Sequence, residues 1–225
     1  MSALVVLSGG MDSVTALHYA ATLHDDVDAL SVDYGQRHVR ELEAAAWQAQ
    51  RAGVRRHDDV DLRSLGSLLS GSALTDDVDV PHGHYADETM RATVVPNRNA
   101  ILANVAAGVA VARGHDAIVL GVHSGDHAIY PDCRPEFVDA LSELLRVANY
   151  DAVRVEAPFL HTDKVGILRV GLALGVEYAQ TWTCYVGRDP ACGTCGSCGE
   201  RREAFDAIMV RDPLSYIGDS EDVAL

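Results

Sequence analysis

Short apolar runs alternate with stretches of helical spacing along the first quarter of the chain. The apolar run at residues 3–7 predicts a buried strand, and residues 28–33 and 55–60 are predicted as the second and third strands. Helical spacing over residues 12–23 and 37–52 predicts the helices that join them. Strands alternating with helices are typical of a parallel sheet with right-handed crossovers. This part of the chain therefore predicts an α/β fold.

The pattern fades between residues 66 and 93, where a polar stretch with Gly, Pro and His predicts a long loop. His82 and His84 are predicted to be solvated loop residues, because two histidines alone make a poor metal site. The pattern then returns, and the remaining elements are expected at residues 96–113, 116–122, 135–147, 152–158, 164–174 and 201–210. Gly114 is the expected stop of the first of these helices. The whole predicts a doubly wound, mostly parallel sheet.

Charge narrows the possible partners. The net charge is −15, from 18 basic and 33 acidic residues, and Lys164 is the only lysine. Such an acidic chain disfavours direct contact with nucleic acid, which takes clustered Lys and Arg. It fits either a merely acidic protein or adaptation to a salt-rich cytoplasm, where self-repulsion is screened. Since no apolar run approaches the ~18 residues of a membrane span and no signal peptide is recognisable, we expect a cytoplasmic protein without membrane contact.

A glycine-rich loop, Ser-Gly-Gly-Met-Asp-Ser at residues 8–13, joins the first predicted strand to the first predicted helix. Glycines let the backbone turn tightly and bring N–H groups close to a ligand, and the helix start adds free donors. The loop therefore suits an anion such as phosphate. It has neither the spacing nor the lysine of a Walker loop. A tight turn with a capping Ser or Asp is the competing interpretation.

Four of the five cysteines crowd the last fifth of the chain. Glycine-rich C-x-x-C turns let several sulfurs face one centre, and four thiolates suit tetrahedral zinc without an open position. The sequence therefore predicts a structural zinc site, with an iron–sulfur cluster as the alternative. The expected ligands are Cys184, Cys192, Cys195 and Cys198.

The string S-G-G-x-D-S after an N-terminal strand resembles the pyrophosphate loop of the N-type ATP pyrophosphatases. These enzymes cleave ATP between its α and β phosphates. The resemblance implies an adenine nucleotide alpha hydrolase-like α/β domain, placed at residues 1–180. The cysteines and the last predicted helix define a zinc-bearing helical segment over residues 181–225. It also implies an ATP site with Asp12 near Mg²⁺, formed by Leu7, Ser8, Gly9, Gly10, Met11, Asp12, Ser13, Val14, Thr15, Ala16 and Leu17.

Four blocks narrow the resemblance. In order and spacing, VDYGQRHVRELEAA, VPNRNAILANVAAGVA, GVHSGDHAIYPDCRPEFVDAL and TWTCY…CGTCGSC resemble the 7-cyano-7-deazaguanine synthase family over residues 4–211. The resemblance implies that ATP activates 7-carboxy-7-deazaguanine, that ammonia gives an amide, and that a second ATP drives dehydration to the nitrile. Whether AMP or ADP is released, and whether the product serves queuosine or archaeosine, stays open.

Catalytic roles follow residue by residue from this resemblance. Lys164 matches the family's lysine at a helix start, and we expect it to neutralise charge on the phosphates beside Asp12. A solvated surface lysine is the alternative. Arg98 is expected to reach phosphate or the substrate carboxylate, as arginine does bidentately. A helix-capping Asn97 with an exposed Arg98 is the competing interpretation.

Substrate contacts are expected at the carboxyl end of the sheet. Tyr34 and Gln36 follow the second strand, where open α/β sheets bind ligands. A carboxylate can pair with a ring N–H and an exocyclic amine together, so Asp126 and Asp132 are candidates for reading the deazaguanine, with Asp132 favoured. Cys133 is interpreted as a buried or incidental cysteine, since no triad-like setting surrounds it.

Two other functions are weighed. A tRNA-modifying enzyme of the same superfamily, such as a thiolase or lysidine synthase, would need a basic surface and, for thiolation, cysteines outside the metal site. A non-catalytic nucleotide- or zinc-binding adaptor would bind ATP without turnover. The chain is too short for a glutaminase domain, so free ammonia or a separate partner must supply nitrogen. The resemblance implies a homodimer.

Overall fold

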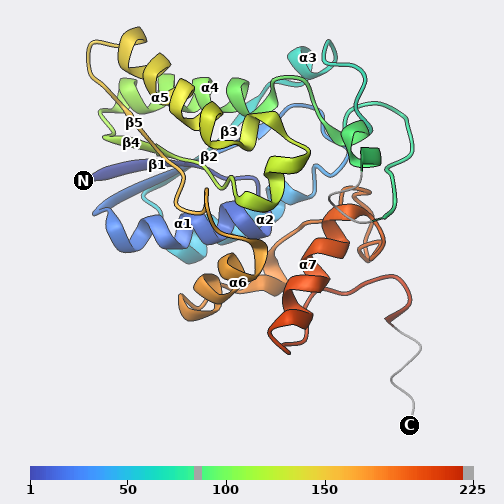
Figure 1. The fold of residues 1–225 in the computed structure, drawn as a ribbon. Coiled ribbons are helices and arrows are strands. Elements are labelled where there is room, and N and C mark those ends of the chain that lie inside the picture. Colours follow the sequence, from blue (N-terminus) through green and yellow to red (C-terminus); the bar gives the residue numbers. More distant parts are fainter. Residues whose placement is uncertain (84–87, 220–225) are drawn as a thin grey trace.

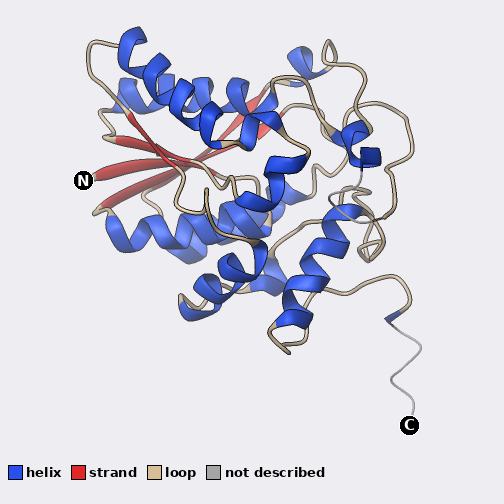
Figure 2. Ribbon diagram, viewed as in Figure 1, coloured by secondary structure: helices blue, strands red, loops and turns tan. Residues whose placement is uncertain are grey.

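A computed structural model describes residues 1–83 and 88–219 of the chain. Its centre is a sheet of five parallel strands in the order β3-β2-β1-β4-β5 (Figures 1 and 2). The predicted doubly wound α/β fold is confirmed, and every strand pair is parallel. The strands are β1 (Ser2–Val6), β2 (Asp26–Asp33), β3 (Arg56–Asp61), β4 (Ala117–Val119) and β5 (Arg154–Glu156).

Helices cover both faces of the sheet (Figure 1). Because side chains alternate along a strand, Ala3 and Val5 of β1 face one apolar core and Leu4 faces the other. The first core includes α1 (Met11–Leu23), α2 (Glu41–Ala52), α6 (Lys164–Ala173) and α7 (Gly196–Ala207). The second includes α4 (Arg98–Arg113) and α5 (Pro135–Ala148). The remaining helices are short: α3 (Arg63–Gly66), η1 (Glu88–Thr93), η2 (Ser124–Ala128), η3 (Pro131–Cys133) and η4 (Tyr178–Gln180).

The predicted elements are present, with shifted ends. Helix α2 begins four residues later than predicted, because residues 37–40 form turns ahead of Glu41. Gly114 ends α4 as predicted, with a φ of 70° that favours glycine. The predicted loop at 66–93 contains η1 at its end. His82 in this loop is exposed and its Nδ1 lies 2.8 Å from Thr194 Oγ1, whereas His84 lies outside the described residues.

The cysteine-bearing end of the chain packs against the α/β part. Ala204 and Phe205 of α7 belong to the same apolar core as α1 and α6. Arg201 is fully buried and donates to Thr181 Oγ1 at 2.6 Å and to the Tyr178 carbonyl at 2.9 Å. A boundary between residues 180 and 181 stays a prediction, and α7 shares its core with the preceding domain.

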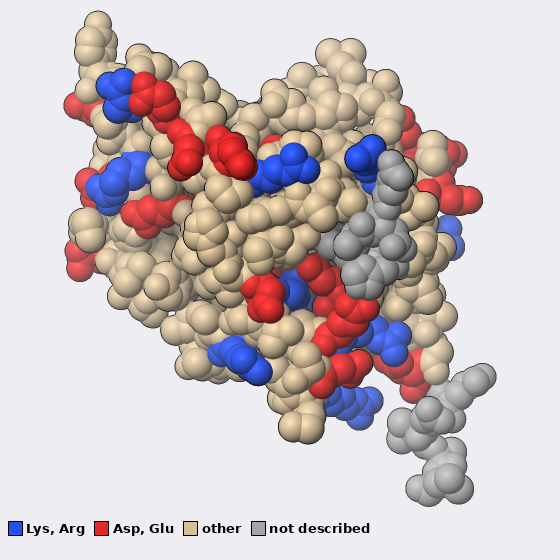
Figure 3. All heavy atoms as spheres, viewed as in Figure 1, with Lys and Arg blue, Asp and Glu red and all other residues tan. Residues whose placement is uncertain are grey.

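The surface agrees with the composition. On the face that Figure 3 shows, Lys and Arg side chains are scattered among Asp and Glu side chains. Among residues 1–83 and 88–219, no helix combines the length and the apolar character that crossing a membrane requires.

Candidate active site

The main cavity lies at the carboxyl ends of β1, β2 and β4. The chain leaves β1 toward β2 and leaves β4 toward β5, so the crevice between β1 and β4 is the switch point at which open α/β sheets bind ligands. The cavity encloses about 1130 Å³, including space that opens to solvent. Its polar lining comes from the glycine-rich loop, from the residues after β2 and β4, and from α4 and α6.

The glycine-rich loop is held in its path by close backbone approaches. Gly9 has a φ of 86°, and a Cβ there would lie 2.0 Å from the Glu41 carbonyl oxygen. Gly121 after β4 approaches so closely that a Cβ would lie 2.9 Å from the Ser13 backbone nitrogen. Ser8 Oγ and Ser13 Oγ are 3.0 Å apart across the turn. Only glycine fits at positions 9 and 121, so this turn is a built feature of the cavity.

A charged cluster stands beside this loop. Lys164 Nζ donates to Asp12 Oδ2 at 2.7 Å and lies 3.0 Å from Glu200 Oε2. The Lys164 side chain is 7% exposed, which excludes the solvated surface lysine. Burial opposes the charge on both members of the pair, yet Asp12 and Glu200 raise the pKa of Lys164 and Lys164 lowers the pKa of Asp12. The ion pair is therefore charged at neutral pH.

His123 is a buried neighbour of this charged cluster. Its ring is fully buried, and the Gly125 backbone N–H donates to Nδ1 at 3.0 Å. That bond leaves the proton of a neutral ring on Nε2, which lies 3.7 Å from Asp12 Oδ2 and 3.5 Å from Asp126 Oδ2. His123 Nε2 has no hydrogen-bond partner among the described residues, so it is a buried donor left open between the two carboxylates. Sequence reasoning missed His123 and Glu200, although one lies in the quoted block GVHSGD and the other two residues after Cys198.

The opposite end of the cavity is aromatic and carries the second predicted cation. Arg98 lies with its guanidinium carbon 5.9 Å from the Tyr130 ring centre. Burial opposes the charge of Arg98, but neighbouring acidic groups, the Asp132 carboxylate among them, raise its pKa, so the guanidinium stays charged. Arg98 lines the cavity and is not the exposed side chain of the competing interpretation. Glu41 and His38 lie in the same wall.

The structure places most predicted site residues at the cavity. Leu7 and Met11 form apolar lining, and Met11 also packs in the core at 1% exposure. The polar members of the predicted set that line the cavity are Ser8, Gly10, Asp12, Ser13, Tyr34, Arg98, Asp126 and Lys164. Gly9 is not among the lining residues, and neither are Val14, Thr15, Ala16 and Leu17, which are buried along α1.

Two predicted substrate residues make hydrogen bonds within the protein. The Gln36 amide accepts from the Tyr34 N–H at 2.9 Å and donates to Glu41 Oε1 at 3.1 Å. Asp132 Oδ2 accepts from the Asn99 N–H at 2.9 Å, which fixes the start of α4. Neither residue lines the cavity. Of the two candidate carboxylates, the geometry therefore favours Asp126 over the preferred Asp132.

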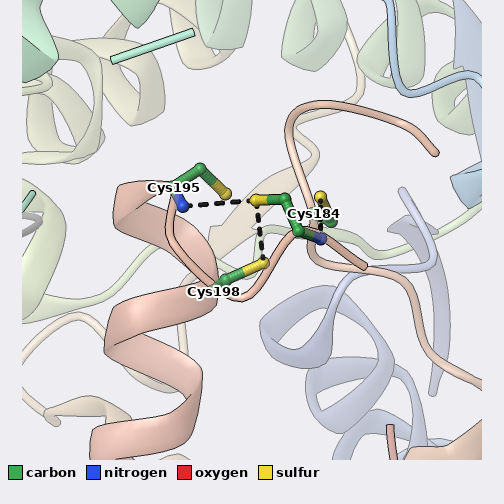
Figure 4. A group of neighbouring side chains, drawn as sticks. Cys184, Cys195 and Cys198 are labelled. Atoms are coloured by element: carbon green, nitrogen blue, oxygen red, sulfur yellow. Dashed lines mark hydrogen bonds between the residues drawn. The ribbon is translucent and has the colours of Figure 1, made fainter. Parts of the chain in front are cut away.

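The four clustered cysteines meet as the spacing predicts. Their sulfurs all lie within 4.8 Å of one another, with Cys192 Sγ and Cys198 Sγ 3.9 Å apart. Tetrahedral zinc with Zn–S bonds of about 2.3 Å needs sulfurs about 3.8 Å apart, so the donor set fits. The backbone N–H groups of Cys192 and Cys195 donate to cysteine sulfurs at 3.3 Å, which favours thiolates. Figure 4 shows Cys195 and Cys198 at the start of α7, facing the segment that carries Cys184.

Fold and site together define a class: a parallel α/β protein whose glycine-rich loop faces a charged cavity at the switch point of the sheet. The family model described as queuosine biosynthesis protein QueC matches residues 2–209. A 7-cyano-7-deazaguanine synthase from Marinobacter nauticus is 57% identical over 215 residues, covering 96% of this chain and 97% of that protein. Proteins of the same name from Pseudoalteromonas translucida and Hahella chejuensis are 52% and 53% identical, each over 95% of this chain and over 97% and 92% of their own lengths. The chain belongs to the queuosine biosynthesis protein QueC family.

Proposed function

We propose that this chain is a 7-cyano-7-deazaguanine synthase that uses ATP to convert 7-carboxy-7-deazaguanine and ammonia to the nitrile. The observation that carries this proposal is the Lys164–Asp12 ion pair, 2.7 Å long, beside the glycine-rich loop in the main cavity. A carboxylate oxygen is a poor leaving group until it carries a phosphoryl group or AMP. The site must therefore hold ATP phosphates and a carboxylate together, and the cavity provides cations at both ends.

Activation belongs to the loop end of the cavity. Ser8, Gly10 and Ser13 would contact the phosphates, with the start of α1 offering backbone N–H donors. Lys164 would neutralise charge that grows on the phosphates in the transition state. Asp12 Oδ1 is buried without a hydrogen-bond partner among the described residues, and an oxygen ligand of this kind suits Mg²⁺. Magnesium held there would shield the phosphates, and Asp12 keeps Lys164 oriented toward them.

Substrate recognition belongs to the rest of the cavity. Asp126 lines it and would accept from the ring N–H and exocyclic amine of the deazaguanine, with His123 Nε2 3.5 Å from its carboxylate. Arg98 would pair with the substrate carboxylate or a phosphate, and Tyr34 and Tyr130 beside it offer aromatic surface. Gln36 would act by holding Tyr34 and Glu41 rather than by touching substrate.

The cysteine cluster is proposed to hold Zn²⁺ as a structural ion. Four thiolates leave no open coordination position, so zinc there would order the start of α7 and take no part in the reaction. Iron and acid-labile sulfide in protein purified without air would instead favour an iron–sulfur cluster.

Other features stay proposals. A homodimer is proposed, and analytical ultracentrifugation of the purified chain would check it. Adaptation to a salt-rich cytoplasm is proposed from the charge of −15, and full activity and stability in dilute buffer would contradict it.

The test is direct. The purified protein is incubated with 7-carboxy-7-deazaguanine, ATP, Mg²⁺ and ammonium in low and high salt, and the products are identified by mass spectrometry. We expect the nitrile, with the amide as an earlier species, and either AMP or ADP identifies the mode of activation. ATP binding without any nitrile in either salt would refute the proposal and favour an adaptor.

A further inference from the structure

A buried carboxyl group stands in the cavity wall with no part in the activation step. Glu41 is the first residue of α2, lines the main cavity, and has a side chain only 10% exposed. A carboxyl group is rarely buried unless it is paired or serves the site. Its position in the quoted block VDYGQRHVRELEAA gave no hint of a role.

Neighbouring side chains aim this carboxyl group. Gln36 Nε2 donates to Glu41 Oε1 at 3.1 Å, while the Tyr34 N–H fixes the Gln36 carbonyl oxygen at 2.9 Å. His38 Nε2 lies 3.5 Å from Glu41 Oε2, and Arg98 from α4 adds a positive charge at longer range. One oxygen is thus held by a neutral amide, and the other faces a histidine.

The backbone places Glu41 directly beside the proposed phosphate loop. A Cβ added to Gly9 would lie 2.0 Å from the Glu41 carbonyl oxygen and 2.7 Å from the Ala45 backbone nitrogen. The start of α2 therefore rests on the loop itself. An acyl group activated on ATP at that loop would form within the same cavity wall.

The chemistry of amide formation needs a proton acceptor. Ammonium has no free electron pair, so it must lose a proton before it can attack. Burial raises the pKa of Glu41 to about 8, which brings the carboxylate closer in basicity to ammonia than an exposed glutamate. Burial lowers the pKa of His38 to about 3, and burial raises the pKa of Tyr34 to about 12, so these two neighbours stay neutral at working pH. Of the groups in this wall, Glu41 is the one that can take up a proton, through the ionised fraction that a pKa of about 8 leaves at pH 7 and that grows as the pH rises.

We propose that Glu41 is the general base that deprotonates ammonium for attack on the activated carboxyl group. The ammonium N–H proton passes to the Glu41 carboxylate, and the electron pair freed on nitrogen forms the C–N bond. The C–O bond to the activating group then breaks, with its electron pair leaving on the phosphoryl oxygen. The new C–NH₃⁺ group loses a proton to water and becomes the amide. This role rests on the proposed function.

The test compares two nucleophiles. Glu41→Gln keeps the size of the side chain and an acceptor for Gln36, but cannot take up a proton. With ammonium at pH 7, we expect the variant to form amide and nitrile about 100-fold more slowly than the wild type. The defect should shrink as the pH rises and free ammonia becomes abundant. Hydroxylamine is neutral at pH 7, so hydroxamate formation from the activated acid should stay close to the wild-type rate.

A matched control and the opposing outcomes make the test sharp. Glu43→Gln removes an exposed carboxylate from the same helix, and we expect wild-type rates with both nucleophiles. Loss of hydroxamate together with amide in Glu41→Gln would mean that Glu41 serves binding or folding, and would overturn the proposal. An equal rate with ammonium at pH 7 would overturn it as well. Failure of the wild type to make either product would instead refute the proposed function.

Discussion

Two buried ionic networks stand at opposite ends of the same sheet. At the amino end, Asp28 of β2 is 1% exposed and accepts from Arg55 Nε at 3.1 Å. Its other oxygen lies 3.0 Å from His115 Nε2 and 3.8 Å from Arg113 Nη1. Both carboxylate oxygens are thus occupied, by Arg55 just before β3 and by Arg113 and His115 at the end of α4 and just after it. No oxygen of the Asp28 carboxylate is therefore left for a ligand at this end of the sheet.

At the carboxyl end of the sheet, a second cluster of charged residues (the open cluster of Lys164, Asp12 and Glu200) keeps one carboxylate oxygen without a described partner. Lys164 joins Asp12 and Glu200, but Asp12 Oδ1 has no hydrogen-bond partner among residues 1–83 and 88–219. This cluster also opens to a cavity, whereas Asp28 does not line one of the described pockets. Burial of charge alone therefore does not mark a functional site. Charge left unsatisfied toward a cavity does, because a ligand can complete its contacts.

We expect the largest effect from losing the metal site at the start of α7, because α7 carries Glu200 to the cluster of Lys164, Asp12 and Glu200. Cys198→Ser should abolish metal binding, which contributes on the order of 10 kcal/mol to ordering such a segment. Helix α7 would lose its anchored start, and nitrile formation would fall below detection. Metal content by mass spectrometry and circular dichroism check this. Cys133→Ser, which changes the one cysteine outside the cluster, should keep the metal; if Cys198→Ser also keeps it, the four-ligand site is wrong.

Removing the cation of the open cluster should cost activity rather than stability. Lys164→Met leaves phosphate charge uncompensated, and we expect kcat to fall about 1000-fold or more. The free energy of unfolding should change less than kcat, because Asp12 lines the cavity with its side chain 25% exposed, so water can reach it. Steady-state kinetics and thermal melting separate the two effects. Arg169→Met on the same helix is exposed and serves as the control. A tenfold loss or less would contradict a role on the phosphates.

Breaking the network around Asp28 should cost stability rather than activity. Asp28→Asn leaves buried His115 and exposed Arg55 without this charged partner, and we expect a loss of about 2 kcal/mol in the free energy of unfolding at pH 7. Burial opposes the charge of Asp28, but hydrogen bonds from Arg55 and His115 lower its pKa overall, so its stabilisation is present above the unfolded pKa and is lost as pH falls through the folded pKa. Wild type and variant should converge in acid. Urea unfolding at pH 7 and in acid checks this, with exposed Asp26→Asn as the control; a variant that loses activity without losing stability would erase the contrast.

The smallest expected effect tests Glu200 as a positioning residue. Glu200→Gln keeps an acceptor for Lys164 but removes one of the two carboxylates that pair with it. We therefore expect about a tenfold fall in kcat and little change in the KM for ATP. Asp206→Asn, exposed on the same helix, should behave as wild type. Equal kcat values in all three proteins would show that Asp12 alone orients Lys164.

Local sequence patterns were enough to predict the order of helices and strands and the motifs whose residues lie close together along the chain. Strand alternation, the glycine-rich loop and the C-x-x-C turns are short-range features, so they predicted the parallel sheet, the phosphate loop and the cysteine cluster. The element ends were less well predicted, as at residues 37–40, because packing of α2 on Gly9 decides where that helix begins. Substrate roles for Gln36 and Asp132 stay predictions, and the sequence could not show the hydrogen bonds that hold both side chains within the protein.

By itself the sequence determined the fold class, the family resemblance and the residue types available to the chemistry. Only the tertiary structure decided which of them meet. Lys164 stands 152 positions from Asp12 and becomes its partner only when α6 packs against α1. Glu200 joins them because α7 shares the same core, and Glu41 enters the cavity because Gly9 lets α2 approach. Long-range contacts of this kind leave no periodic signal along the chain, because the distance between two side chains is set by how the elements pack.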